Sequence, residues 1–139
     1  LYAQRLKLTE PGAHIVLPQI ISKEPLGPVV RQGDNQWGDI VRWSHFAMVN
    51  AEEAGVTCKN VGTMKTNRTP AIRRLLGVDG TFGTNMGISN DWAYNIIRTV
   101  GNYAETFERN VGKSTPLGIA RGVNALWTQG GLQYAPPVR

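Results

Sequence analysis

Residues 20–55 decide the fold of this chain, and they read IISKEPLGPVVRQGDNQWGDIVRWSHFAMVNAEEAG. The stretch begins with β-branched residues, is interrupted by Pro25 and Pro28, and resumes at Val29. Because proline lacks a backbone donor, these two positions suit an edge strand or a crossing between two bodies rather than a central strand. We therefore predict an extended crossing and a short strand over residues 29–31, followed by a long helix.

The helix after the crossing is predicted to run from about Gln36 to Ala54. The turn at residues 33–35 supplies its cap, and Gly55 can take the left-handed conformation that ends a helix. One stripe at helical spacing holds Trp37, Ile40, Val41, Ser44, Ala47, Met48 and Ala51, and is widened by Trp43 and Phe46. So broad an apolar face predicts that the helix contacts other parts of the protein on two sides.

The rest of the chain predicts few strands and several helices. A short strand is expected at residues 13–17, and residues 78–89 are expected to form a loop. Helices are predicted over residues 69–76, over residues 91–111, and from Thr115 to Trp127. Two or three strands are too few for a sheet covered on both faces. This deficit predicts that part of the protein is missing from the chain.

Composition indicates a globular domain, with 139 residues of which 41% are hydrophobic and 18% are charged. The net charge is +5, but the longest basic run is the pair Arg73–Arg74, so we expect no nucleic-acid partner. No apolar run approaches the roughly 20 residues of a membrane helix. The chain begins at Leu1 without methionine or a signal peptide, which predicts a processed chain or a piece of a longer one.

The residues whose side chains could act in catalysis or bind a metal form no catalytic, metal-binding or cofactor-binding pattern. His14 and His45 lack the spacing of a metal site. Cys58 is the single cysteine and excludes an intrachain disulfide, and we interpret it as a buried, inert thiol. Glu52 and Glu53 are adjacent on the predicted helix, so their carboxylates point apart. The sequence therefore predicts a protein that is not an enzyme and carries no cofactor.

The four tryptophans could line a sugar-binding groove, but we favour packing, since most lie on core-facing stripes. Trp127 is expected to face inward from the last predicted helix.

A resemblance to a known family is carried by five stretches of the sequence. These are LPQIISKEPLGPVVRQGDNQWGDIVRW (17–43), AEEAGVT (51–57), IRRLLGV (72–78), NDWAYNIIRTVGNYAETFERNVG (90–112) and RGVNALWTQGGLQYAPPVR (121–139). Together they resemble the C-terminal part of the general L-amino-acid-binding proteins of alpha-proteobacterial ABC importers. The resemblance implies the two-lobed α/β fold of a type II periplasmic binding protein and an absent N-terminal half.

The resemblance also implies a division of this chain. Residues 1–20 would end the second lobe, residues 21–25 would form one inter-lobe crossing, and residues 26–139 would supply the closing strand and helices of the first lobe, with a C-terminal helical extension. Most residues that grip the ligand in the family lie upstream of Leu1 and have no counterpart here. Ser22, Lys23, Glu24 and Pro25 remain as candidate ligand-binding or hinge residues. The alternative is a plain hinge, or a surface ion pair between Lys23 and Glu24, which would contribute about 0–1 kcal/mol.

The function implied is that of a periplasmic solute-binding component of an ABC importer for L-amino acids, which selects its ligand by lobe closure. Its partners would be an L-amino acid and the transporter permease, through which alone it would meet the membrane. We expect this chain by itself to bind amino acids weakly or not at all and to self-associate through uncovered apolar surface. The alternative is a stand-alone module that binds a protein or peptidoglycan. An enzymatic function would require His45 or Cys58 to take part in catalysis.

Overall fold

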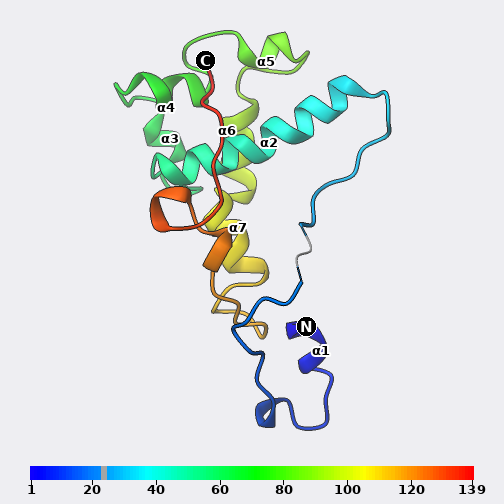
Figure 1. Cartoon of the computed structure of the whole chain (residues 1–139). Coiled ribbons are helices and arrows are strands. Elements are labelled where there is room, and N and C mark those ends of the chain that lie inside the picture. Colours follow the sequence, from blue (N-terminus) through cyan, green and yellow to red (C-terminus); the bar gives the residue numbers. More distant parts are fainter. Residues whose placement is uncertain (23–24) are drawn as a thin grey trace.

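The computed structural model describes residues 1–22 and 25–139, and helices dominate them (Figure 1). The α-helices are α1 (Tyr2–Arg5), α2 (Asn35–Glu53), α3 (Val61–Met64), α4 (Pro70–Leu75), α5 (Phe82–Asn85), α6 (Trp92–Val100) and α7 (Tyr103–Asn110). Three 3₁₀ turns are η1 (Pro11–Ala13), η2 (Gly122–Asn124) and η3 (Trp127–Gln129). Within the described residues there is no β-strand, and an isolated parallel bridge joins Leu126 to Gln133.

The strands predicted early in the chain are therefore wrong for the described residues. Residues 11–13 form η1, and residues 29–31 carry no sheet pairing. A strand is stable only when a neighbouring strand satisfies its backbone groups, and the described part of the chain offers none to this segment. The described residues therefore show helices without the strands that the predicted α/β class requires.

Helix α2 matches its prediction closely because its end signals are local. The Asp34 Oδ1 atom accepts a hydrogen bond from the Trp37 backbone N–H at 3.1 Å, which caps the first turn. At the other end Gly55 has a φ of +67°, the left-handed conformation that ends helices. The short helix predicted at residues 69–76 is likewise confirmed as α4, with Pro70 in its first turn.

The core forms around α2, which contacts α4, α6 and α7. On one side Ala47 and Ala51 pack into the main cluster of buried residues. That cluster also holds Val56, Val61, Ile72, Leu75, Leu76, Trp92, Ala93, Ile97 and Val138. On the other side Val49 packs with Leu126 and Ala135 in a second cluster. The predicted contact of α2 on two sides is therefore confirmed.

The helix predicted over residues 91–111 is wrong as a single element, because it breaks at Gly101 into α6 and α7. Gly101 has a φ of +86°, and Asn102 then caps α7. The Asn102 Oδ1 atom accepts from the Glu105 N–H at 2.9 Å, and Glu105 Oε2 accepts from the Asn102 N–H at 2.8 Å. This reciprocal capping box satisfies two free donors at a helix start. Asn102 Nδ2 also donates to the Val56 carbonyl at 2.9 Å, which ties the break to the core.

The helix predicted from Thr115 to Trp127 is also wrong, since only η2 and η3 form there. Gly118 and Gly122 both adopt positive φ in this region, which interrupts any regular helix. The chain then returns across α2 as an extended segment (Figure 1). Asn50 Nδ2 donates to the Pro136 carbonyl at 2.8 Å, and Val138 is buried. Within the loop predicted over residues 78–89, residues 82–85 form α5.

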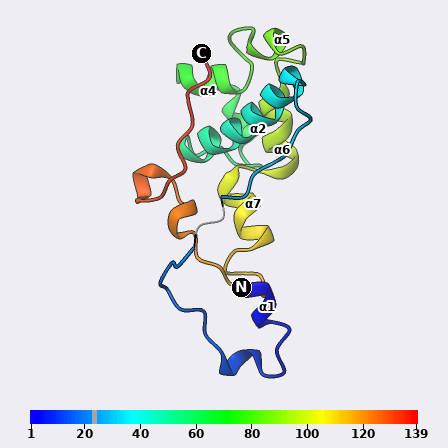
Figure 2. The same cartoon turned by 45° about the vertical axis from the view of Figure 1, so that its right-hand side comes forward.

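The described residues before Pro28 lie outside the helical body, as Figures 1 and 2 both show. Several apolar side chains before α2 are exposed, among them Ile15, Leu17, Ile20, Ile21, Leu26 and Val29. The helical body therefore owes its packing to the chain from α2 onward.

Candidate functional site

The predicted crossing lies in the exposed part of the chain. Ser22 and Pro25 are exposed, while Lys23 and Glu24 lie outside the described residues. The flanking residues Ile21 and Leu26 are 94% and 92% exposed, so neither packs against the helical body. The ligand-binding or hinge role of residues 22–25 stays a prediction.

The segment that follows the predicted crossing contacts the helical body just before α2. Pro28 and Val30 line a pocket of about 280 Å³ together with Gly38, Val41 and His45. The Val30 side chain lies over Gly38, 3.6 Å from the position a Cβ atom would occupy there. This contact anchors the chain just before the helix, while Ile20, Ile21 and Leu26 stay exposed.

A guanidinium site joins the end of α2 to the segment before η2. Arg121 Nη2 donates to both Glu52 carboxylate oxygens at 3.0 Å and to the Asn124 carbonyl at 2.9 Å. Its guanidinium carbon lies 5.3 Å from the ring centroids of both Tyr103 and Phe107. Burial raises the pKa of the Tyr103 phenol. The largely buried Arg121 is thus held by one carboxylate and two aromatic rings, which is a favourable setting for a guanidinium.

Cys58 is exposed, so the prediction of a buried thiol is wrong. Its Sγ atom donates to Glu105 Oε1 at 3.0 Å, and its backbone N–H donates to Glu105 Oε2 at 3.0 Å. The hydrogen bond to Glu105 raises the pKa of the Cys58 thiol above its ordinary value. The thiol is therefore accessible, and the neighbouring carboxylate disfavours its reactive thiolate form.

We expect Glu105→Gln to make Cys58 react faster with iodoacetamide at pH 8. The thiolate is the nucleophile, and removing the carboxylate lowers the thiol pKa, so more thiolate is present. The rate measured against pH should show its midpoint moved to lower pH, and this midpoint shift separates the effect from loosening of α7. Glu10→Gln, at an exposed residue on the N-terminal segment, is the matched control. An unchanged midpoint in Glu105→Gln would contradict the prediction.

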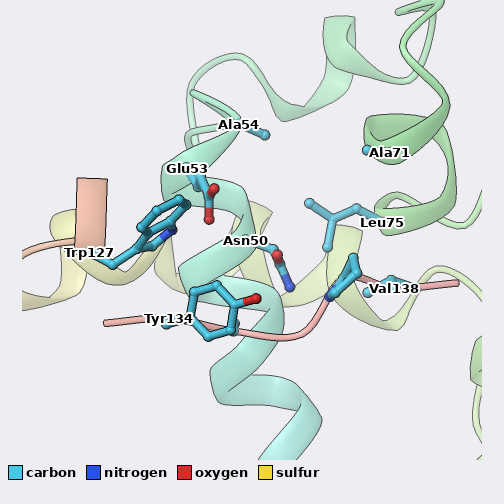
Figure 3. Close-up of a pocket in the computed structure, with 10 residues that line it drawn as sticks. Asn50, Glu53, Ala54, Ala71, Leu75, Trp127, Tyr134 and Val138 are labelled. Atoms are coloured by element: carbon cyan, nitrogen blue, oxygen red, sulfur yellow. The ribbon is translucent and has the colours of Figure 1, made fainter. Parts of the chain in front are cut away.

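A second pocket, of about 360 Å³, lies between the end of α2, α4 and the C-terminal segment (Figure 3). Glu53, Trp127 and Tyr134 gather at one end of it, and Leu75 and Val138 lie at the other. The Trp127 and Tyr134 rings meet edge to face, with centroids 5.7 Å apart. Trp127 is 51% exposed, so its predicted inward orientation is wrong. No local pattern of residues indicates this pocket, because its walls are far apart in the chain.

Metal-binding clusters and membrane-spanning helices are both absent from the described residues. No cluster of three or more His, Cys, Asp or Glu side chains there could hold a metal ion. No described helix combines the length and apolar character needed to cross a bilayer.

Comparison with known proteins finds several close relatives. The general L-amino acid-binding periplasmic protein AapJ of Rhizobium johnstonii is 60% identical over the whole chain. The putative amino-acid ABC transporter-binding protein YhdW of Escherichia coli is 59% identical, and the glutamate/glutamine/aspartate/asparagine-binding protein BztA of Rhodobacter capsulatus is 55% identical. The resemblance to amino-acid-binding proteins of ABC transporters is confirmed.

A solved structure agrees with these relatives. It is an ABC transporter periplasmic binding protein from Brucella ovis with glutathione bound, 55% identical, with a TM-score of 0.94 over 99% of this chain. The chain spans 41% of the length of each curated relative and 44% of the solved chain. No family model matches the sequence. The relatives are named as binding proteins, which agrees with the predicted absence of an enzymatic step.

Proposed function

We propose that this chain belongs to the periplasmic solute-binding component of an ABC importer for L-amino acids. The observation that carries the proposal is 55–60% identity, maintained over all 139 residues, to proteins named for amino-acid binding. The alignments with these relatives cover the whole chain, and so include both the helical body and the predicted crossing. The protein would act by binding and release of an amino acid, without a chemical step.

The division expected from the sequence forms part of this proposal. Residues 1–20 would end one lobe, residues 21–25 would be the crossing, and residues 26–139 would complete the other lobe. The helical body around α2 supports the last assignment, since it carries its own buried core. The exposure of Ile20, Ile21, Leu26 and Val29 supports the first two, because apolar side chains in water are stabilised when another surface covers them.

Closure of the two lobes around the ligand would then require the crossing to bend. A ligand shifts the balance between open and closed lobes only by its differential affinity for the two states. The permease would read the closed state, and this contact would be the route by which the protein meets the membrane. Ser22 to Pro25 would bend or contact the ligand during closure.

Titration calorimetry tests the proposal on two proteins. One is this 139-residue chain, and the other is the product of the full open reading frame that contains it. The ligands are glutamate, glutamine, aspartate, leucine, arginine and glutathione, the last because it occupies the solved relative. We expect micromolar binding of at least one ligand by the longer protein and weak or no binding by the chain alone.

Two outcomes count against the proposal. If the longer protein binds none of these ligands, the assignment to amino-acid uptake fails. If the 139-residue chain binds any of them at micromolar concentration, the division of the site between this chain and the rest of the protein fails.

Self-association of the isolated chain follows from the same exposed segment. Residues 15–29 expose several large apolar side chains in sequence, which favours contact between copies. Light scattering on the calorimetry sample should give a mass above that of one chain. A monomer at high concentration would argue that the segment is covered in some other way.

A further inference from the structure

The pocket at the end of α2 resembles, in its chemistry, the site that already holds Arg121. Glu52 and Glu53 are neighbours on α2 and point apart, as adjacent helix positions do. The Glu52 carboxylate accepts hydrogen bonds from Arg121, whose guanidinium lies beside the rings of Tyr103 and Phe107. Glu53 instead lines the open pocket beside Trp127 and Tyr134. The site formed by Glu52 and its two aromatic rings is therefore occupied by a guanidinium. The corresponding site formed by Glu53 and its two aromatic rings is open to solvent.

Beside the Trp127 indole N–H and the Tyr134 hydroxyl, the pocket holds two acceptors without a partner among the described residues, the Glu53 carboxylate and the Asn50 Oδ1 atom. No hydrogen bond or ion pair to another described residue involves the Glu53 side chain. The Asn50 Nδ2 group donates a hydrogen bond to the Pro136 carbonyl, and the Asn50 Oδ1 atom remains available as an acceptor. At the far end, Arg74 Nε donates a hydrogen bond to the Val138 carbonyl at 3.3 Å. A donor-rich cation therefore fits the open end, where it can meet a carboxylate and an amide oxygen.

The aromatic rings favour a planar cation presented by a protein. Trp127 and Tyr134 are 51% and 67% exposed, so a free small molecule would stay largely in water, whereas small-molecule sites bury most of their ligand. Half-exposed tryptophan and tyrosine are instead typical anchors of protein interfaces. A guanidinium stacks on such rings and pairs with a carboxylate in one plane, which an ammonium does not do.

We propose that this pocket is a docking site for an arginine side chain of a partner protein. Its volume of about 360 Å³ accommodates one long side chain. Glu53 pairs with the guanidinium, Trp127 and Tyr134 flank it, and Leu75 with Val138 contact the aliphatic stem. None of the residues that line the site belongs to the predicted crossing.

The test uses short capped peptides and the 139-residue chain. The probes are Ac-Gly-Arg-Gly-NH₂, its lysine analogue and its citrulline analogue, which keeps the shape of arginine but lacks the charge. Binding is followed by the ¹⁵N resonance of the Trp127 indole, identified by its loss in Trp127→Leu. We expect millimolar binding of the arginine peptide, and about five-fold or greater weakening with citrulline, as expected for loss of a charge over aromatic rings.

Variants with matched controls complete the design. Glu53→Gln should weaken the arginine peptide at least about five-fold, and Trp127→Leu should weaken it similarly when followed by the backbone resonances of residues 134–138. Glu10→Gln and Trp37→Leu are the controls, since Glu10 is exposed and Trp37 is 53% exposed but lies outside the pocket. Their spectra also report whether the fold is intact.

Three results would overturn the proposal. One is equal binding of the arginine and citrulline peptides, and another is unchanged binding in Glu53→Gln. The third is tighter binding of the lysine peptide or of free choline than of the arginine peptide, which would assign the pocket to an ammonium group.

Discussion

Replacing Gly77 by alanine should destabilise the chain by about 2–5 kcal/mol, the sum of backbone strain and overpacking. Gly77 ends the region of α4 with a φ of +69°, a conformation that residues with a Cβ atom adopt at a cost. A Cβ atom there would also overlap the Asn90 backbone carbonyl, which cannot move aside as a flexible side chain could. The substitution therefore forces the start of α6 away from α4.

Gly80→Ala is the matched control for this prediction. Gly80 has a φ of +87°, but a Cβ atom added to it meets nothing within 4 Å. It should therefore cost only the conformational term of about 1–2 kcal/mol. Urea unfolding followed by circular dichroism measures both variants. Equal losses in the two would mean that the contact between Gly77 and Asn90 does not constrain the fold.

Replacing Arg121 by methionine should lower the free energy of unfolding by about 2–4 kcal/mol. Its side chain is 17% exposed and that of Glu52 is 8% exposed, so the substitution leaves a carboxylate largely out of water without its partner. Breaking a buried pair from one side costs about 3–5 kcal/mol, and the residual exposure of Arg121 reduces this. The Asn124 carbonyl and the rings of Tyr103 and Phe107 lose a contact as well.

A double substitution separates charge from packing in this site. Arg121→Met combined with Glu52→Gln removes both charges, and it should recover part of the stability lost in the single variant. Arg73→Met is the comparison for an ion pair at the surface, since Arg73 and Asp79 are 34% and 46% exposed, and it should change stability little. If Arg121→Met alone is as mild as Arg73→Met, the Glu52–Arg121 pair does not hold the C-terminal segment to α2.

Local signals made some of the fold predictable. Asp34 as cap and Gly55 as terminator fixed α2 to within a residue or two, because caps act over three or four residues of chain. The break before α7 also had a local signal, the spacing of Asn102 and Glu105 after Gly101, which periodicity alone had hidden. Strands, by contrast, depend on pairing with distant chain, so residues 29–31 could not be judged by their own composition.

By itself, the sequence determined which family this chain resembles and where its main helix begins and ends. Both follow from residues close together in the chain. Only the tertiary structure decided that Glu52 is covered by Arg121 while its neighbour Glu53 faces an open aromatic pocket, and that Cys58 lies exposed against Glu105. The partners in these contacts are tens of residues apart, and no local pattern records which distant side chains packing brings together.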